Sequence, residues 1–208
     1  MAMVLVCLMS DAQADEQKLG VYNGTVSIMG AKLGEYIQTR FSAEVKTRLP
    51  ITNRKKTSAM AELDDVKTPS STALIKQWSV TGKNSMPDSD GKISTWTCEI
   101  AEPTEVPMNG TGTLDLNYAT SKYKMFIALV ALKPIPLRCV NSRSGPYQDE
   151  TFANLFFGTG EPVFFHSIEL PFQNASDIKA TYQLVPIHEL KGQYSPVDMT
   201  WNLQLQPE

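Results

Sequence analysis

The residue types that most often carry chemistry are sparse in this chain of 208 residues, and its three cysteines form the clearest pattern. Cys7 lies in an apolar run near the N-terminus, whereas Cys98 and Cys139 lie far along the chain. In an oxidising compartment, a pair such as Cys98 and Cys139 most simply forms a disulfide. The bond would close a loop of ~40 residues and stabilise the fold by about 4 kcal/mol through chain entropy. A zinc site is not indicated, because the two thiols lack correctly spaced partners.

The N-terminus has two of the three parts of a secretory signal. An apolar run from Ala2 to Met9 precedes Ala12-Gln13-Ala14, a pattern of small residues after which signal peptidases cut. No lysine or arginine precedes the run, and the alternative is a short strand that ends in a polar turn. We expect residues 1–14 to be a cleaved signal peptide, which removes Cys7 and leaves one pair of cysteines. Residues 15–208 are then expected to form one exported domain, periplasmic or extracellular.

The two histidines, His166 and His188, are the candidates for a catalytic base. His166 lies on the apolar face of an alternating segment, a position that is more typical of the edge of a core. His188 is followed by Glu189 but lacks the second histidine, four residues on, of a zinc protease. A catalytic base at His166 would also need a nucleophile and an orienting carboxylate, which the sequence cannot place in space. The sequence therefore favours a non-catalytic protein, and an envelope hydrolase with a site assembled from loops around His166 or His188 is the alternative.

Asp88 and Asp90, in the segment PDSDGKIS, resemble the middle of a calcium-binding loop. When Gly91 takes the place of the loop glycine, the first and closing ligand positions fall on Met86 and Thr97, which have no carboxylate. A polar Asp-Gly hairpin turn accounts for the same residues, so calcium is the weaker interpretation. No cofactor is expected, because the two Gly-Thr-Gly segments lack the lysine of a phosphate-binding loop.

Alternation of apolar and polar residues is the dominant pattern along the chain. From Ile37 to Lys46 every second residue is polar or charged, which predicts a strand with one solvated face. Similar strands are predicted at Val21–Ile28, Leu74–Val80, Ile93–Ile100, Thr113–Tyr118, Val163–Leu170, Ile178–Val185 and Met199–Leu205.

Three further segments have less regular patterns. Tyr123–Leu132 is apolar on both faces, which predicts a central strand covered on each side, with a buried helix stopped by Pro134 as the rival. Residues 118–123 predict a hairpin connection. Asp149–Gly158 groups apolar residues on one helical face before a glycine, and Ser58–Val66 could form another short helical turn.

These elements predict a mainly antiparallel β-sandwich, with a small β-barrel as the alternative and one or two short helices in the connections. Thirteen prolines and twelve glycines fall mostly between the strands, as is typical of all-β proteins. The net charge of -3 gives no reason to expect nucleic acid binding. No apolar run approaches the ~20 residues of a membrane-spanning helix. We expect an exported, non-catalytic binding protein whose partner is a protein, a glycan or a lipid at the cell envelope.

Overall fold

The structure, a computed structural model, describes residues 20–64, 71–161, 166–184 and 197–207. Within these residues the protein is all-β, every strand pair is antiparallel and there is no helix, hence none that could cross a membrane. This confirms the predicted sandwich-like all-β architecture. The strands are β1 (Val21–Leu33), β2 (Ile37–Arg54), β3 (Ser58–Asp64), β4 (Ser71–Lys83), β5 (Thr95–Glu99), β6 (Thr104–Asn117), β7 (Lys122–Ala131), β8 (Ile135–Asn141), β9 (Gly145–Thr151), β10 (Asn154–Gly158), β11 (Gly160–Glu161), β12 (His166–Ser167), β13 (Leu170–Pro171), β14 (Asp177–Leu184) and β15 (Val197–Gln206).

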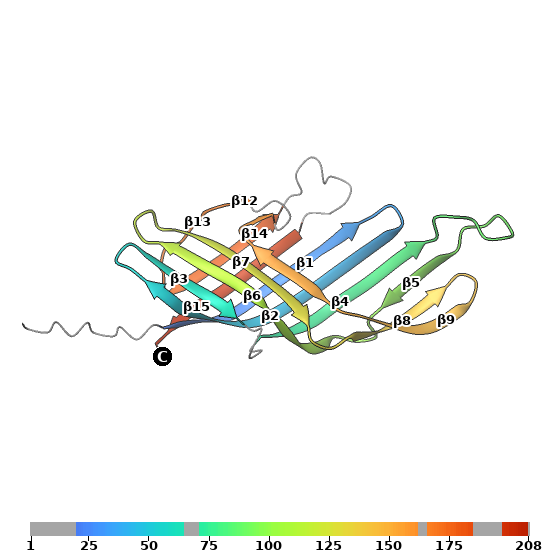
Figure 1. Cartoon of the computed structure of the whole chain (residues 1–208), viewed down its shortest axis with the longest axis horizontal. Helices are drawn as coiled ribbons and strands as arrows, with labels where there is room; N and C mark the ends of the chain where they lie inside the picture. The colour runs from blue at the N-terminus through green and yellow to red at the C-terminus, as the bar shows by residue number, and fades with distance from the viewer. Residues whose placement is uncertain (1–19, 65–70, 162–165, 185–196, 208) are drawn as a thin grey trace, which may run out of the picture.

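Thirteen of the strands form one continuous sheet that folds over itself (Figure 1). Its order is β14-β15-β1-β2-β3-β6-β4-β5-β8-β9, and β7 pairs with β6 on one side and with β10 and β13 on the other. β3 and β4 lie end to end between β2 and β6, because each of them pairs with both. The second half of β4 continues outward and pairs with β5.

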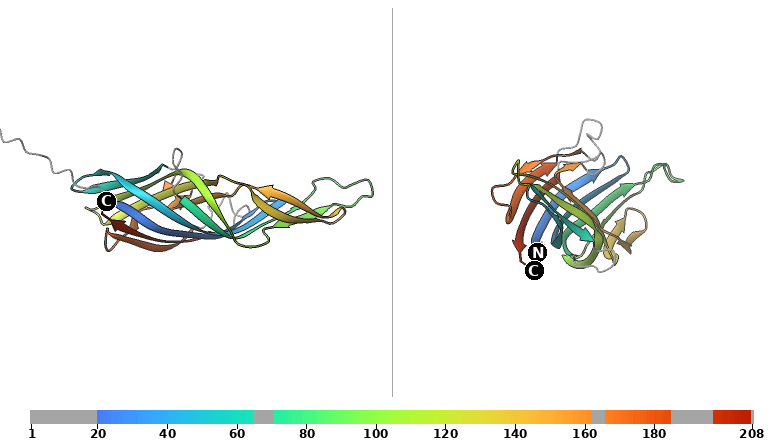
Figure 2. Two further views of the ribbon diagram at one scale, coloured as in Figure 1. Left: turned by 90° about the horizontal axis from the view of Figure 1, so that it is seen from below. Right: turned by 60° about the vertical axis from the view of Figure 1, so that its left-hand side comes forward.

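The molecule is elongated and has two parts (Figure 2). We call the two-layered part, which contains β1, β2, β3, the first half of β4, β6, β7, β10, β13, β14 and β15, the body. We call the projecting part, which contains the second half of β4 with β5, β8 and β9, the arm. One cluster of buried side chains extends from Trp201 in the body to Cys98 and Cys139 in the arm. The predicted signal peptide, residues 1–14, lies outside the described residues.

The two layers of the body are joined by a buried aromatic pair, Tyr123 of β7 and Trp201 of β15. The indole Nε1 of Trp201 donates a hydrogen bond to the Tyr123 hydroxyl at 2.8 Å, and the rings meet edge to face. Burial raises the pKa of Tyr123, so the phenol remains a neutral group that can accept this bond. Since β7 and β15 are not paired in the sheet, the contact crosses the core and fixes the two layers against each other.

Most of the predicted strands are confirmed, and several are longer than their alternating patterns indicate. The strand predicted from Ile37 extends to Arg54, and β15 contains the whole of the predicted last strand. The hairpin connection is also confirmed, since β6 ends at Asn117 and β7 begins at Lys122. The strand predicted from Val163 differs: its first residues lie outside the described part, and the remainder forms the short β12 and β13.

The helical turn expected at Ser58–Val66 is wrong, because the described part of this segment is the strand β3. Ala59, Ala61 and Leu63 alternate into the core, and β3 bonds to both β2 and β6. Pairing on two sides supplies hydrogen bonds over the whole segment, which outweighs a short local helical pattern.

The helix expected at Asp149–Gly158 is also wrong, because this segment contains the end of β9 and all of β10. Leu155 is buried, whereas Phe152 and Phe156 are exposed on the other face. The three residues share one face at helical spacing, but only the two even-numbered ones share a face at strand spacing. Pairing of β9 with β8 and of β10 with β7 selects the strand.

We expect the substitution Tyr123→Phe to lower the free energy of unfolding by about 1–3 kcal/mol, because it leaves the buried indole N–H of Trp201 without an acceptor. Urea denaturation followed by tryptophan fluorescence measures the change. The matched control is Tyr36→Phe at an exposed tyrosine, which we expect to stay within about 0.5 kcal/mol of the wild type. Equal stabilities for Tyr123→Phe and the wild type would contradict a structural role for the bond.

Candidate functional site

The strands β7 to β10 form one long ribbon that runs from the body to the end of the arm and back. β7 leads into β8, the chain turns at residues 142–144, and β9 leads back into β10 (Figure 1). Odd-numbered residues of β7, β8 and β10 face the core, as Leu129, Leu137 and Leu155 illustrate. Because side chains alternate along a strand, the even-numbered residues face outward along the whole ribbon.

The outward surface of the ribbon in the body is apolar and open, and we call it the apolar face. Its large side chains have exposed fractions of 37% for Phe126, 48% for Val130, 44% for Leu132, 50% for Phe152 and 47% for Phe156. Phe156 of β10 lies directly opposite Ala128 of β7, so its ring has Phe126 and Val130 as diagonal neighbours. Exposed apolar residues are ordinary when they are scattered, whereas a contiguous group of this kind is a candidate interaction surface.

This face corrects the expectation that Tyr123–Leu132 is covered on both sides. The strand itself is confirmed as β7, and the rival helix is wrong. Only the face that contains Tyr123, Ile127 and Leu129 is buried, while Phe126 and Val130 remain in contact with solvent. The apolar residues on the second face therefore do not serve the core.

Two backbone hydrogen bonds establish which groups of β10 face β7. The amide of Ala131 donates to the carbonyl of Ala153 at 2.9 Å, and the amide of Thr159 donates to the carbonyl of Met125 at 2.9 Å. Both bonds fit the register of the ladder, in which Phe156 opposes Ala128. In an antiparallel ladder, bonded and non-bonded pairs alternate, so the odd-numbered residues of β10 bond to β7.

The backbone groups of Asn154, Phe156 and Gly158 consequently point away from β7, and we call this row the β10 edge. No described strand pairs with it. None of the three residues is charged and none is a proline, so each offers an N–H donor and a C=O acceptor. The β10 edge and the apolar face therefore meet at Phe156, which contributes its backbone to one and its side chain to the other.

The edge of the arm, β9, differs because it is blocked against strand pairing. The backbone groups of the even-numbered residues of β8 bond to β5, so those of its odd-numbered residues bond to β9. The backbone groups of Pro146, Gln148 and Glu150 therefore point away from β8, at the open edge of β9. Pro146 has no amide hydrogen to donate. The amide of Glu150 already donates to the carboxylate of its neighbour Asp149 at 2.8 Å. Such features keep an edge from adding a further strand.

The remaining edges of the large sheet are protected in similar ways. The backbone of Pro171 points away from β7 at the open edge of β13, where a proline has no amide hydrogen to donate. The backbone groups of Lys179, Thr181 and Gln183 point away from β15, at the open edge of β14. The Lys179 ammonium lies 2.8 Å from the Asp177 carboxylate. Among the described strands longer than two residues, β10 is thus the one whose unpaired edge has neither a proline nor a charge.

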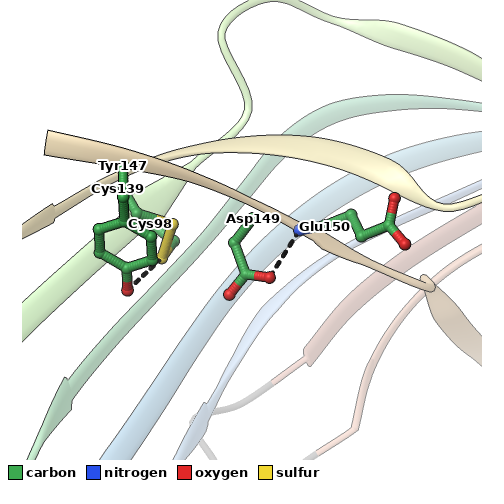
Figure 3. The surroundings of a disulfide bond; sticks show 5 residues. All are labelled: Cys98, Cys139, Tyr147, Asp149 and Glu150. Atoms are coloured by element: carbon green, nitrogen blue, oxygen red, sulfur yellow. Dashed lines mark hydrogen bonds between the residues drawn. A yellow bond between two sulfur atoms is a disulfide. The ribbon is translucent and has the colours of Figure 1, made fainter.

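A disulfide joins Cys98 of β5 to Cys139 of β8, the pair expected from the sequence (Figure 3). The two residues lie directly opposite each other in the ladder, and both are buried. The Tyr147 hydroxyl donates a weak hydrogen bond to Cys98 Sγ at 3.7 Å, because a disulfide sulfur has no hydrogen. The Asp149 carboxylate is also near, but oxidised sulfurs are not the thiolates that bind zinc. The bond therefore acts as a covalent tie across the arm.

Asp88 and Asp90 lie at the end of the arm, and both carboxylates contact the guanidinium of Arg143. Arg143 Nε lies 2.9 Å from Asp88 Oδ2, and its Nη2 bonds to Asp90 Oδ1. This bond to Arg143, together with one from the Lys92 amide, lowers the pKa of Asp90. The contacts join the β4–β5 loop to the β8–β9 turn. The calcium interpretation remains a prediction, which would require a cation to displace Arg143.

The outward side of the arm contains an open hollow of about 570 Å³. Apolar Val140 and Pro146 line one part, and the charged residues Glu99 and Arg138 oppose each other in the ladder. The hollow is open and mixed in character, with one acidic and one basic side chain among its lining residues.

The two histidines are not brought to a described site. His166 lies in β12, where its backbone pairs opposite Glu161. His188 lies outside the described residues. The hydrolase alternative therefore stays a prediction without a described group of side chains to support it.

Comparison with known proteins finds no matching family model, no matching curated protein and no matching solved structure. The chemistry of the molecule's own surface is the basis for a functional proposal.

The sequence patterns did not predict the apolar face or the β10 edge. The spacing of Phe152 and Phe156 predicts a helix, and the pattern of Tyr123–Leu132 predicts a strand covered on both faces. Two sequence features together could have indicated them: Tyr123–Leu132 is apolar on both faces, and the segment NLFFG at residues 154–158 is uncharged.

We expect replacement of both cysteines, Cys98→Ala with Cys139→Ala, to lower the free energy of unfolding by about 4 kcal/mol, because the bond closes a long loop. Guanidinium denaturation of the oxidised wild type and the double variant measures the loss. Thr97→Ala, on the exposed opposite face beside Cys98, is the matched control and should change little. A double variant as stable as the wild type would contradict the role of the disulfide as a tie.

Proposed function

We propose that the protein is an exported binding protein whose docking surface, formed by the apolar face and the β10 edge, receives another protein chain. The observation that carries this proposal is their coincidence on one strand: β10 exposes Phe156 and Phe152 lies just before it, and its outward backbone groups have no described partner. Extended chains bind sheet edges through such backbone groups, with side-chain contacts that add specificity.

A protein partner fits this surface better than a glycan or a lipid. A glycan needs converging polar side chains, whereas the apolar face offers mainly phenyl and aliphatic groups. A membrane surface favours uncompensated basic residues beside the apolar group. The lysines of β7, Lys122 and Lys124, share the Glu169 carboxylate at 3.8 and 3.9 Å, and Asp115 lies opposite Lys124 in the ladder. Lys133, next to Leu132, is a single lysine and not the basic cluster that a membrane surface favours.

The energetics are those of a modest interface. Full burial of a phenylalanine side chain contributes about 1.5–3 kcal/mol, so a ring that is already half-buried adds about 1 kcal/mol on docking. Phe126, Phe152 and Phe156 therefore supply a central apolar contact. The backbone groups of the β10 edge then fix the direction and register of the bound strand.

The export part of the proposal is supported by the disulfide, which is compatible with an oxidising compartment. We expect the protein from its natural host to have an intact mass that begins at Asp15. That mass should be lower by the hydrogens lost when Cys98 and Cys139 are oxidised, which mass spectrometry with and without reduction measures. An uncleaved chain with free thiols would contradict export.

The docking surface is tested by a photo-crosslinking amino acid placed at Phe156 in the natural host. We expect one discrete protein adduct after irradiation, because this position lies where the β10 edge and the apolar face meet. The matched control position is Thr200 of β15, which is exposed on the layer opposite β7 and should give none.

The mass of the adduct identifies the partner. Absence of any adduct from Phe156, or equal adducts from Phe156 and Thr200, would contradict a docking surface at β10.

A further inference from the structure

We infer that the occupant of the β10 edge is the β10 edge of a second copy of this chain, paired antiparallel around a two-fold axis at Phe156. This inference rests on the proposed function, because it assigns a partner to the same docking surface. It requires no additional site, since a two-fold interface uses one self-complementary surface on each copy.

The geometry of β10 suits this symmetric pairing. The strand has five residues, Asn154–Gly158, and Phe156 is its centre. Antiparallel pairing about that centre sets Phe156 opposite Phe156 of the second copy, and Asn154 opposite Gly158 of the second copy. All three outward residues point both backbone groups at the partner, so each opposed pair exchanges both hydrogen bonds.

The charges of the sheet edges favour β10 over the other edges for pairing between identical chains. β10 has no charged residue, so two copies meet without repulsion. At β9 the acidic Glu150 and the missing amide hydrogen of Pro146 oppose the same arrangement. At β14 the outward row contains Asp177 and Lys179, which are solvated and paired with each other.

The pairing also extends the apolar face. Strand addition at β10 would place the apolar faces of both copies side by side in one continuous surface, with the Phe156 rings as a cross-strand aromatic pair. The contact between the two copies consists of the two β10 backbone rows and the Phe156 rings, while the other side chains of both apolar faces stay exposed. This contact is smaller than a standard interface, so we expect a weak, reversible dimer.

The experiment is sedimentation velocity on the full oxidised chain from about 1 μM to about 500 μM, a range that covers weak dimers. We expect the wild type to shift from monomer to dimer with concentration. Phe156→Lys and Phe156→Glu should each raise the dissociation constant at least about tenfold, because like charges would oppose each other across the two-fold axis.

An equimolar mixture of the two charge variants provides the decisive measurement. Lysine and glutamate then oppose each other, so we expect mixed dimers at concentrations at which each variant alone is monomeric. Recovery on mixing cannot result from misfolding, and urea denaturation of each variant verifies its fold. Thr111→Lys and Thr111→Glu are the controls on the same outward side and should associate as the wild type does.

A wild type that stays monomeric over the whole range overturns the inference, and so does a mixture that fails to recover association. A Phe156 crosslink to a different protein overturns the second copy as occupant but leaves the proposed docking surface intact. A Phe156 crosslink between two copies, together with recovery on mixing, supports both.

Discussion

The two-residue period of an antiparallel ladder is the constraint on which the rest of the structure depends. In β10 the odd-numbered residues, Leu155 and Phe157, bury their side chains and bond their backbone to β7. The even-numbered residues must then expose their side chains and point their backbone groups away from β7. Phe156 therefore exposes its ring and its backbone groups together, and the apolar face and the β10 edge follow from one register. Slippage by one residue would bury Phe156 and expose the core residues.

Contacts in the core and in the arm hold the strands that support this register. The hydrogen bond between Trp201 and Tyr123 joins β15 to β7 across the core and fixes the two layers against each other. In the arm, the disulfide of Cys98 and Cys139 ties β5 to β8. The edges of β9, β13 and β14 contain prolines or charged residues that disfavour further pairing. β10 has neither a proline nor a charged residue, as expected for an edge that receives the proposed partner.

Much of the fold could be predicted from the sequence, because alternation reports directly on which side chains face a core. β2 and β15 follow their patterns, and the cysteine pair follows once Cys7 is set aside. The docking surface could not be predicted in this way. Phe152, Leu155 and Phe156 fit a helical face by spacing alone, and only pairing with distant β7 makes them a strand. Whether an apolar strand face is covered depends on the arrangement of other elements, which no local pattern contains.

The central claim is that the even-numbered backbone groups of β10 point away from β7. Amide hydrogen exchange, followed residue by residue by NMR, tests it most directly, because the exchange rate shows whether each N–H is hydrogen-bonded. In dilute solution we predict slow exchange at Leu155 and Phe157, which bond to β7, and fast exchange at Asn154, Phe156 and Gly158. As the protein concentration rises, the three outward amides should gain protection while the other two remain unchanged. Protection of the Phe156 amide in dilute solution, or exchange there that is independent of concentration, would contradict the account.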